Sequence, residues 1–193
     1  MKKAIRIGVV FIASVALILG YYYYLSTRSA KPSKSNYSTD EVLAICDKDM
    51  VNDYPGTPRQ VVKWYNRIIT AYYSEDFTEE EFGKMIDQAR ALLDDELLLY
   101  NERPSYMIAL AAEIEDYHKR KRYIISSDVS DSADVTYATV NGYEVAYVKA
   151  YYFSKEGSNF DKTYEDYVLR KDSQGHWKIL TWRLSTDADE FRK

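Results

Sequence analysis

Cysteine and histidine are scarce in this sequence of 193 residues, which contains only Cys46, His118 and His176. A single cysteine excludes an intrachain disulfide and any zinc site built on cysteines. Two isolated histidines form no metal-binding pattern. A P-loop, a dinucleotide-binding glycine motif and a serine-nucleophile motif are also missing. The sequence therefore predicts no catalytic motif, no metal site and no cofactor.

Clustered positive charge is also largely missing. Lys2, Lys3 and Arg6 lie before the first long apolar segment, and all 30 acidic residues lie after it. The rest of the chain therefore carries 23 basic and 30 acidic residues, a net charge of −7. Because neutralising phosphates requires clustered basic residues, the sequence predicts no nucleic-acid partner.

One uncharged segment is long enough to cross a membrane. Ile7 to Leu25 reads IGVVFIASVALILGYYYYL. As a helix it would span about 28 Å, close to the hydrocarbon thickness of a bilayer. Tyr21 to Tyr24 fill its last turn, where their apolar rings and polar hydroxyls suit the membrane interface. The sequence predicts a signal anchor over residues 1–25, with the membrane as a partner through Ile7 to Leu25.

Two questions about this anchor have alternative answers: on which side of the membrane the domain lies, and whether the segment is cleaved off. A basic start followed by an apolar core favours an extracytoplasmic domain, although Arg28, Lys31 and Lys34 nearly balance the charge across the segment. A cleaved signal peptide is the alternative to an anchor, but no A-x-A pattern follows the core. We therefore expect a single-pass protein of the cell membrane, with its domain outside.

Helices are predicted first in the remaining chain. Residues 26–37 are rich in Ser and Lys and predict a flexible tether before a folded domain of residues 38–193. Three capping boxes mark helix starts. They are Ser38 with Glu41, Thr57 with Gln60, and Thr78 with Glu81. The second helix has an apolar stripe of Val61, Tyr65, Ile68 and Tyr72. A fourth helix is predicted from near Pro104 to the basic run HKRKR.

Strands are predicted from Tyr123 onward, where the apolar period changes to two. The expected strands are residues 123–129, 134–140, 143–154, 161–171 and 176–185. Asn141-Gly142 is typical of a two-residue hairpin turn, and Asp172 to Gly175 predicts another turn. Strands joined in this way are antiparallel. The order of helices before strands predicts the α+β class, with helices on one face of the sheet.

Two stretches then resemble a known fold. TPRQVVKWYNRIITAYYSEDF is similar to the opening helix of the nuclear transport factor two-like superfamily, which ends in an acid and Phe, here Asp76-Phe77. YVLRKDSQGHWKILTW is similar to its last hairpin. The resemblance to this fold, also called SnoaL-like or cystatin-like, covers about residues 57 to 185. It implies a curved sheet that helices close into a cone with a cavity.

The resemblance does not name a function, because this fold hosts isomerases, dehydratases, cyclases and many non-enzymes. With a single N-terminal span, the arrangement is similar to anchored scaffold subunits of type IV secretion and conjugation machines. It is also similar to anchored proteins of Gram-positive bacteria.

Two carboxylates are the first candidates for ligand contact. Glu165 and Asp166 are neighbours on a predicted strand, so one of them must face the covered side of the sheet. Burial there would raise its pKa and suit it as a general base. The alternative is a position at the wet rim of the sheet.

Aromatic and basic residues provide three further candidates. Tyr147 shares a strand face with Tyr143 and Tyr151, and we expect Trp177 and Trp182 on opposite faces of the last strand. Such rings could stack on sugars or peptides, although a place in the core is the more common alternative. His118 begins HKRKR, which could contact anionic lipid or wall polymers. A solvated helix end is the alternative for it.

Two functions remain open from the sequence. The first is an anchored, non-enzymatic binding module with a protein or a wall polymer as its partner. The second is a small-molecule enzyme of the isomerase or dehydratase kind that uses an inward carboxylate. An open cone with an inward Asp or Glu beside a Tyr hydroxyl would favour the enzyme, and a cone filled by Trp and Leu would exclude it.

Overall fold

The computed structural model describes residues 36–185. The predicted anchor of residues 1–25 and most of the predicted tether lie outside the described residues. Between residues 36 and 185, no helix combines the length and the apolar composition that a membrane crossing requires. A compact unit begins at Ser38 and contains the helices and strands that follow, apart from the first two residues of α2.

Five helices form one layer of this unit. They are α2 (Asn36–Cys46), α3 (Pro58–Ser74), α4 (Glu79–Arg90), α5 (Asp95–Leu99) and α6 (Arg103–Lys119). Thr57 caps α3 by accepting from the backbone N–H of Gln60, and Pro58 follows at the start of that helix. The Thr78–Glu81 capping box makes both of its hydrogen bonds. These two predicted helix starts are therefore confirmed.

The structure differs from the predicted helices at two places. The start at Ser38 is wrong, because α2 already begins at Asn36. Neither Pro nor Gly stands between these two residues to delay the helix. The short helix α5 was not predicted. Asp94 starts it by accepting from the backbone N–H of Glu96 at 2.9 Å.

Five antiparallel strands form the other layer. They are β1 (Arg122–Val129), β2 (Thr136–Val140), β3 (Tyr143–Glu156), β4 (Asn159–Lys171) and β5 (Trp177–Leu184). The order is β1-β3-β4-β5, and β2 pairs with the first part of β3. At the predicted hairpin turn, Asn141 and Gly142 have φ angles of 51° and 84°, as a tight turn between β2 and β3 requires. The predicted α+β class with an antiparallel sheet is confirmed.

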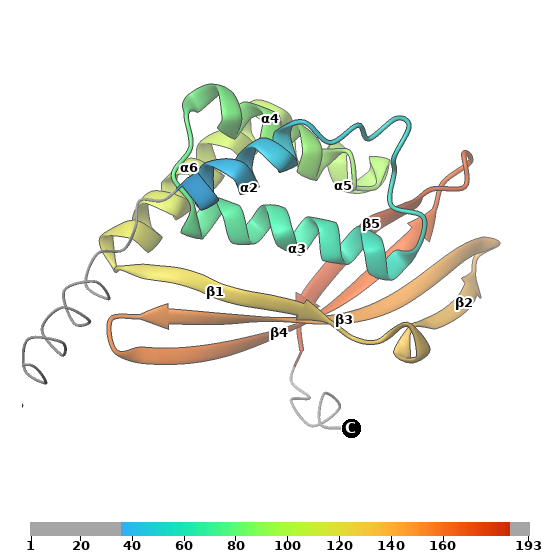
Figure 1. Cartoon of the computed structure of the whole chain (residues 1–193). Coiled ribbons are helices and arrows are strands. Elements are labelled where there is room, and N and C mark those ends of the chain that lie inside the picture. The colour runs from blue at the N-terminus through green and yellow to red at the C-terminus, as the bar shows by residue number, and fades with distance from the viewer. Residues whose placement is uncertain (1–35, 186–193) are drawn as a thin grey trace, which may run out of the picture. The chain divides into compact units, whose positions relative to one another are not determined.

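The helices lie on one face of the curved sheet, with α3 crossing that face (Figure 1). The predicted stripe of α3 packs there: Val61, Ile68 and Tyr72 are fully buried, and Tyr65 is 4% exposed. The loop after α4 adds a contact with the sheet edge. Ile179 of β5 donates its N–H to Leu92 and accepts from the N–H of Asp94, at 2.8 and 2.9 Å. The core therefore lies between the helices and this face, which we call the inner face.

The aromatic residues of the last strand do not alternate as predicted. Val168 pairs with Thr181 and Leu169 pairs with Ile179, so Leu180 is an extra residue on β5. This bulge reverses the alternation of side chains. Trp177 pairs with Lys171 and Trp182 pairs with Tyr167, both on the same side of β4. The prediction of opposite faces for the two tryptophans is therefore wrong, and both lie on the inner face.

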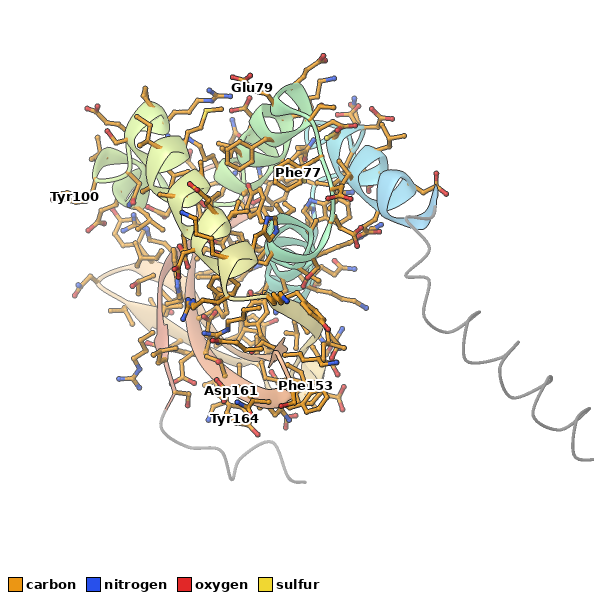
Figure 2. All side chains as sticks on the ribbon, turned by 90° about the vertical axis from the view of Figure 1, so that its left-hand side faces the viewer. Phe77, Glu79, Tyr100, Phe153, Asp161 and Tyr164 are labelled. Atoms are coloured by element: carbon orange, nitrogen blue, oxygen red, sulfur yellow. The ribbon has the colours of Figure 1, made fainter. Side chains whose placement is uncertain are left out.

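The tyrosine row of β3 lies on the opposite, outer face of the sheet. Tyr143 and Tyr147 are 53% and 42% exposed, and Tyr151 is half-buried. Figure 2 shows Phe153 of β3 and Tyr164 of β4 at the end of the molecule away from the helices. The core position considered for these tyrosines is therefore wrong, because their side of β3 faces away from the helix layer.

Candidate functional site

A cavity of about 320 Å³ lies between the inner face, α3 and α6. This volume is at the lower end of the range of about 300–1,000 Å³ that is typical of small-molecule pockets. Aromatic side chains form much of its wall. They are Tyr65, Tyr73, Tyr106, Tyr117, Tyr152, Tyr167 and Trp182. The cavity is therefore mainly apolar, with its polar groups concentrated at a few positions.

Glu165 is the main polar group of the inner wall. It lies in the middle of β4 and lines the cavity, as does Tyr167 two residues later on the same face. Tyr167 donates a hydrogen bond to Glu165 Oε2 at 2.5 Å. Among residues 36–185, no other group hydrogen-bonds this carboxylate and no basic side chain forms an ion pair with it. The carboxylate is thus inside the cavity with a single donor.

A buried polar network continues from Tyr167 behind the cavity wall. Its hydroxyl lies 3.2 Å from the Tyr152 hydroxyl, and Tyr152 donates to Asn66 Oδ1 at 2.8 Å. Asn66 comes from α3 and is 1% exposed, so the network connects the helix layer to two strands. Protonation of Glu165 would reverse the hydrogen bond that it now accepts from Tyr167, whereas Asn66 Oδ1 can only accept and Tyr152 remains its donor.

Burial dominates the electrostatics of this wall. It raises the pKa of Glu165, while the hydrogen bond from Tyr167 acts in the opposite direction. Burial also raises the pKa values of Tyr152 and Tyr167 well above their usual range, so both remain neutral donors. Since desolvation disfavours a charge, Glu165 takes up a proton more readily than an exposed glutamate does.

The opposite end of the cavity has a different charge balance. Arg122 lines it at the start of β1, with its guanidinium 4.9 Å from the centre of the Tyr117 ring. Its Nη2 lies 3.7 Å from Asp161 Oδ2 and donates weakly to Ser154 Oγ at 3.4 Å. Glu113 of α6 also lines this cavity, and burial together with the Glu113 carboxylate raises the pKa of Tyr73. The single basic residue of the wall is therefore already paired.

Of the other predicted contact residues, Trp182 lines the same cavity as Glu165, and the remaining three do not. Asp166 and Tyr147 line a second cavity of about 530 Å³, formed mainly by side chains of the outer face, and Trp182 borders both cavities. The exposed His118 lines neither of these two cavities. In the run that it begins, Lys119, Arg120 and Arg122 form ion pairs with Glu115, Asp116 and Asp161. These pairs favour the helix-end interpretation of HKRKR.

Sequence reasoning missed Asn66 and Tyr152, and it considered Arg122 only as part of the HKRKR run and not as a cavity residue. One signal was available for Asn66, because it interrupts an apolar row of α3 between Val62 and Tyr73. A polar residue at such a position requires a buried hydrogen-bond partner. In the described part of the chain, no group of three or more His, Cys, Asp or Glu could hold a metal ion.

A family model described as a domain of unknown function, DUF6715, matches residues 1–182. No curated protein matches this sequence.

Proposed function

We propose that this chain, which belongs to the DUF6715 family, is a membrane-anchored extracytoplasmic domain that binds a small organic molecule in its inner cavity. The observation that carries the proposal is Glu165, a carboxylate on an aromatic cavity wall that has one hydrogen bond and no countercharge among residues 36–185. Few polar groups in an otherwise apolar pocket are typical of sites that orient a small ligand. A domain that needed this space only for packing would be more stable with an apolar side chain there.

The finer description of the fold is part of this proposal. Helices followed by a curved antiparallel sheet, with a cavity between the two layers, support a nuclear transport factor two-like cone. A protein or a wall polymer is proposed as a further partner. The exposed rings of Tyr143 and Tyr147 on the outer face support this partner, because aromatic rings can stack on sugars and peptides.

The anchor and the location rest on Ile7 to Leu25 and on the basic residues before them. Mass spectrometry of the membrane fraction should identify an intact N-terminal peptide, and a protease added to intact cells should remove the domain. A soluble product that starts near Ala30 would show that the segment is a cleaved signal peptide.

The binding function is tested with a variant that blocks the cavity. Ala109 lines the cavity and is exposed, so Ala109→Trp would place an indole at the mouth without disturbing the core. Ala111→Trp is the matched control, because Ala111 is exposed on the same helix and does not line this cavity.

The full-length chain in lipid nanodiscs is equilibrated with a small-molecule extract of the cells that make it, and the retained compounds are identified by mass spectrometry. The wild type and Ala111→Trp should retain a compound that Ala109→Trp does not. If all three proteins retain the same compounds, or none, the proposal is wrong.

A second function, proton transfer to or from the bound molecule, is favoured by the Glu165–Tyr167 pair. The cavity has the arrangement that the sequence assigned to an isomerase or dehydratase, an inward carboxylate beside a Tyr hydroxyl. A raised pKa brings a glutamate closer to the working range of a general base at neutral pH.

Deuterium exchange tests this second function. The compounds retained by the wild type are incubated in D₂O with the wild type or with Glu165→Gln, which keeps the shape of the side chain and removes its basicity. Catalysis predicts that a C–H position gains deuterium, or that the compound is converted, with the wild type alone. If the wild type retains a compound but neither exchanges its hydrogens nor converts it, the domain binds the compound without catalysis.

A further inference from the structure

The Glu165 carboxylate lacks a positive partner. Carboxylates removed from bulk water are normally paired with a cation or held by several hydrogen bonds. Here Tyr167 is its only hydrogen-bond donor among residues 36–185. Tyr152 donates its hydrogen bond to Asn66 Oδ1, and Asn66 Nδ2 is buried without a partner among the described residues. The charge of Glu165 is therefore uncompensated within the described domain.

Three aromatic rings pack together on the cavity wall that carries Glu165, and Trp182 is the exposed one of the three. The ring centre of Tyr65 lies 6.1 Å from that of Tyr167 and 5.9 Å from that of Trp182. Tyr167 and Trp182 lie 6.3 Å apart with nearly parallel rings. The negative faces of Trp and Tyr rings attract organic cations, and several rings together recognise quaternary ammonium groups.

The cavity already contains one example of this contact. The guanidinium of Arg122 lies 4.9 Å from the centre of the Tyr117 ring at the other end. At that end the protein provides its own cation, which is also paired with Asp161. At the Glu165 end, rings and a carboxylate are present and no basic side chain lines the wall.

From this difference we infer that the ligand carries a cationic nitrogen, an amine or a quaternary ammonium group, which binds between Glu165 and the ring of Trp182. The inference rests on the proposed binding function and adds the chemical class of the ligand. An anion would be repelled by Glu165, and a neutral molecule would leave the charge uncompensated. The cavity volume of about 320 Å³ limits the ligand to a small one.

A pair of probes with the same shape isolates the charge. Choline carries a trimethylammonium group, and 3,3-dimethylbutan-1-ol has a carbon atom in place of its nitrogen. Binding of both to the full-length chain in nanodiscs is measured by calorimetry, with Ala109→Trp as the blank for uptake by the lipid. We expect choline to bind at least tenfold more tightly than the alcohol.

Glu165→Gln tests the position of the charge. It should weaken choline binding at least tenfold and change binding of the alcohol less than threefold. Glu115→Gln, on the exposed face of α6, removes the same charge away from the cavity and should change neither probe. If the wild type does not prefer choline to the alcohol, or if Glu165→Gln keeps that preference, the inference is overturned.

The two proposals can fail separately. The wild type could retain a compound that Ala109→Trp does not retain and still show no preference for choline. That result would reject the positive charge of the ligand and keep the binding function. Absence of any such compound would remove the binding function itself.

Discussion

Glu165 and Asp166 are neighbours on β4, yet their carboxylates have different surroundings. Asp166 belongs to the outer face, where its Oδ2 lies 3.4 Å from Arg183 of β5. Glu165 belongs to the inner face, where it meets aromatic rings and the Tyr167 hydroxyl. In the described part of the chain, the outer carboxylate thus has a countercharge and the inner one has none. The two neighbours therefore differ in the charge that they meet, although Asp166 Oδ1 is also buried without a hydrogen-bond partner among residues 36–185.

The largest expected effect compares one tyrosine from each face. Tyr167 is 1% exposed and Tyr147 is 42% exposed. Tyr167→Ala should lower the free energy of unfolding by about 3–5 kcal/mol, because a large ring leaves the core. Tyr147→Ala should cost less than about 1 kcal/mol. Thermal unfolding of the full-length chain in nanodiscs measures both, and equal losses would contradict the assignment of the two faces.

A smaller effect is expected when only the Tyr167 hydroxyl is removed. Tyr167→Phe should cost about 1 kcal/mol, the typical contribution of one hydrogen bond. It should also raise the pKa of Glu165 further, because the hydrogen bond from Tyr167 opposes the effect of burial. Choline binding needs the ionised carboxylate, so its pH midpoint should move upward. Tyr147→Phe is the control. If Tyr167→Phe leaves the pH midpoint of choline binding unchanged, the Tyr167 hydroxyl does not influence the pKa of Glu165.

The next prediction concerns stability against pH. Because the pKa of Glu165 is raised, the folded chain binds this proton more tightly than the unfolded chain does. The free energy of unfolding should therefore fall as pH rises from the ordinary glutamate pKa through the raised one. Glu165→Gln should lack this fall and become the more stable protein at the upper end of that window.

Glu115→Gln is the control for this titration. Its hydrogen bond to Lys119 lowers the pKa of Glu115, so the stability that it contributes is lost as pH falls. The two variants should differ from the wild type with opposite signs. A stability difference for Glu165→Gln that does not change with pH would show that Glu165 is not the titrating group.

The smallest effect is expected at the outer face. Arg183 is 82% exposed, so its ion pair with Asp166 is screened by water. Arg183→Ala should change the free energy of unfolding by less than about 0.5 kcal/mol and leave choline binding unchanged. A loss above about 1 kcal/mol would show that the outer carboxylate depends on its partner more than an exposed ion pair does.

Features with local causes could be predicted from the sequence. Thr57 and Thr78 cap their helices by hydrogen bonds to residues three positions away, and Asn141-Gly142 needs only its own backbone angles to make the turn. The alternation of a strand also showed that either Glu165 or Asp166 must be inward.

Features decided by pairing between distant segments could not be predicted. The extra residue Leu180 moves Trp182 to the inner face, and the pairing of β5 with β4 reveals it. Asn66 and Tyr152 are 86 positions apart and meet only because α3 crosses β3. The helix layer likewise decides which of the two carboxylates is covered. The residues of the cavity wall could therefore be identified only from the packed structure.

The contact between the loop after α4 and β5 has a consequence for aggregation. β5 is an edge strand, and the free N–H and C=O groups of such a strand can pair with a second chain. At Ile179 both backbone groups are already bonded, to Leu92 and Asp94. Arg170 of β4 holds this loop in place through its ion pair with Asp94. Because the loop occupies these backbone groups, a second chain cannot pair with β5 at Ile179.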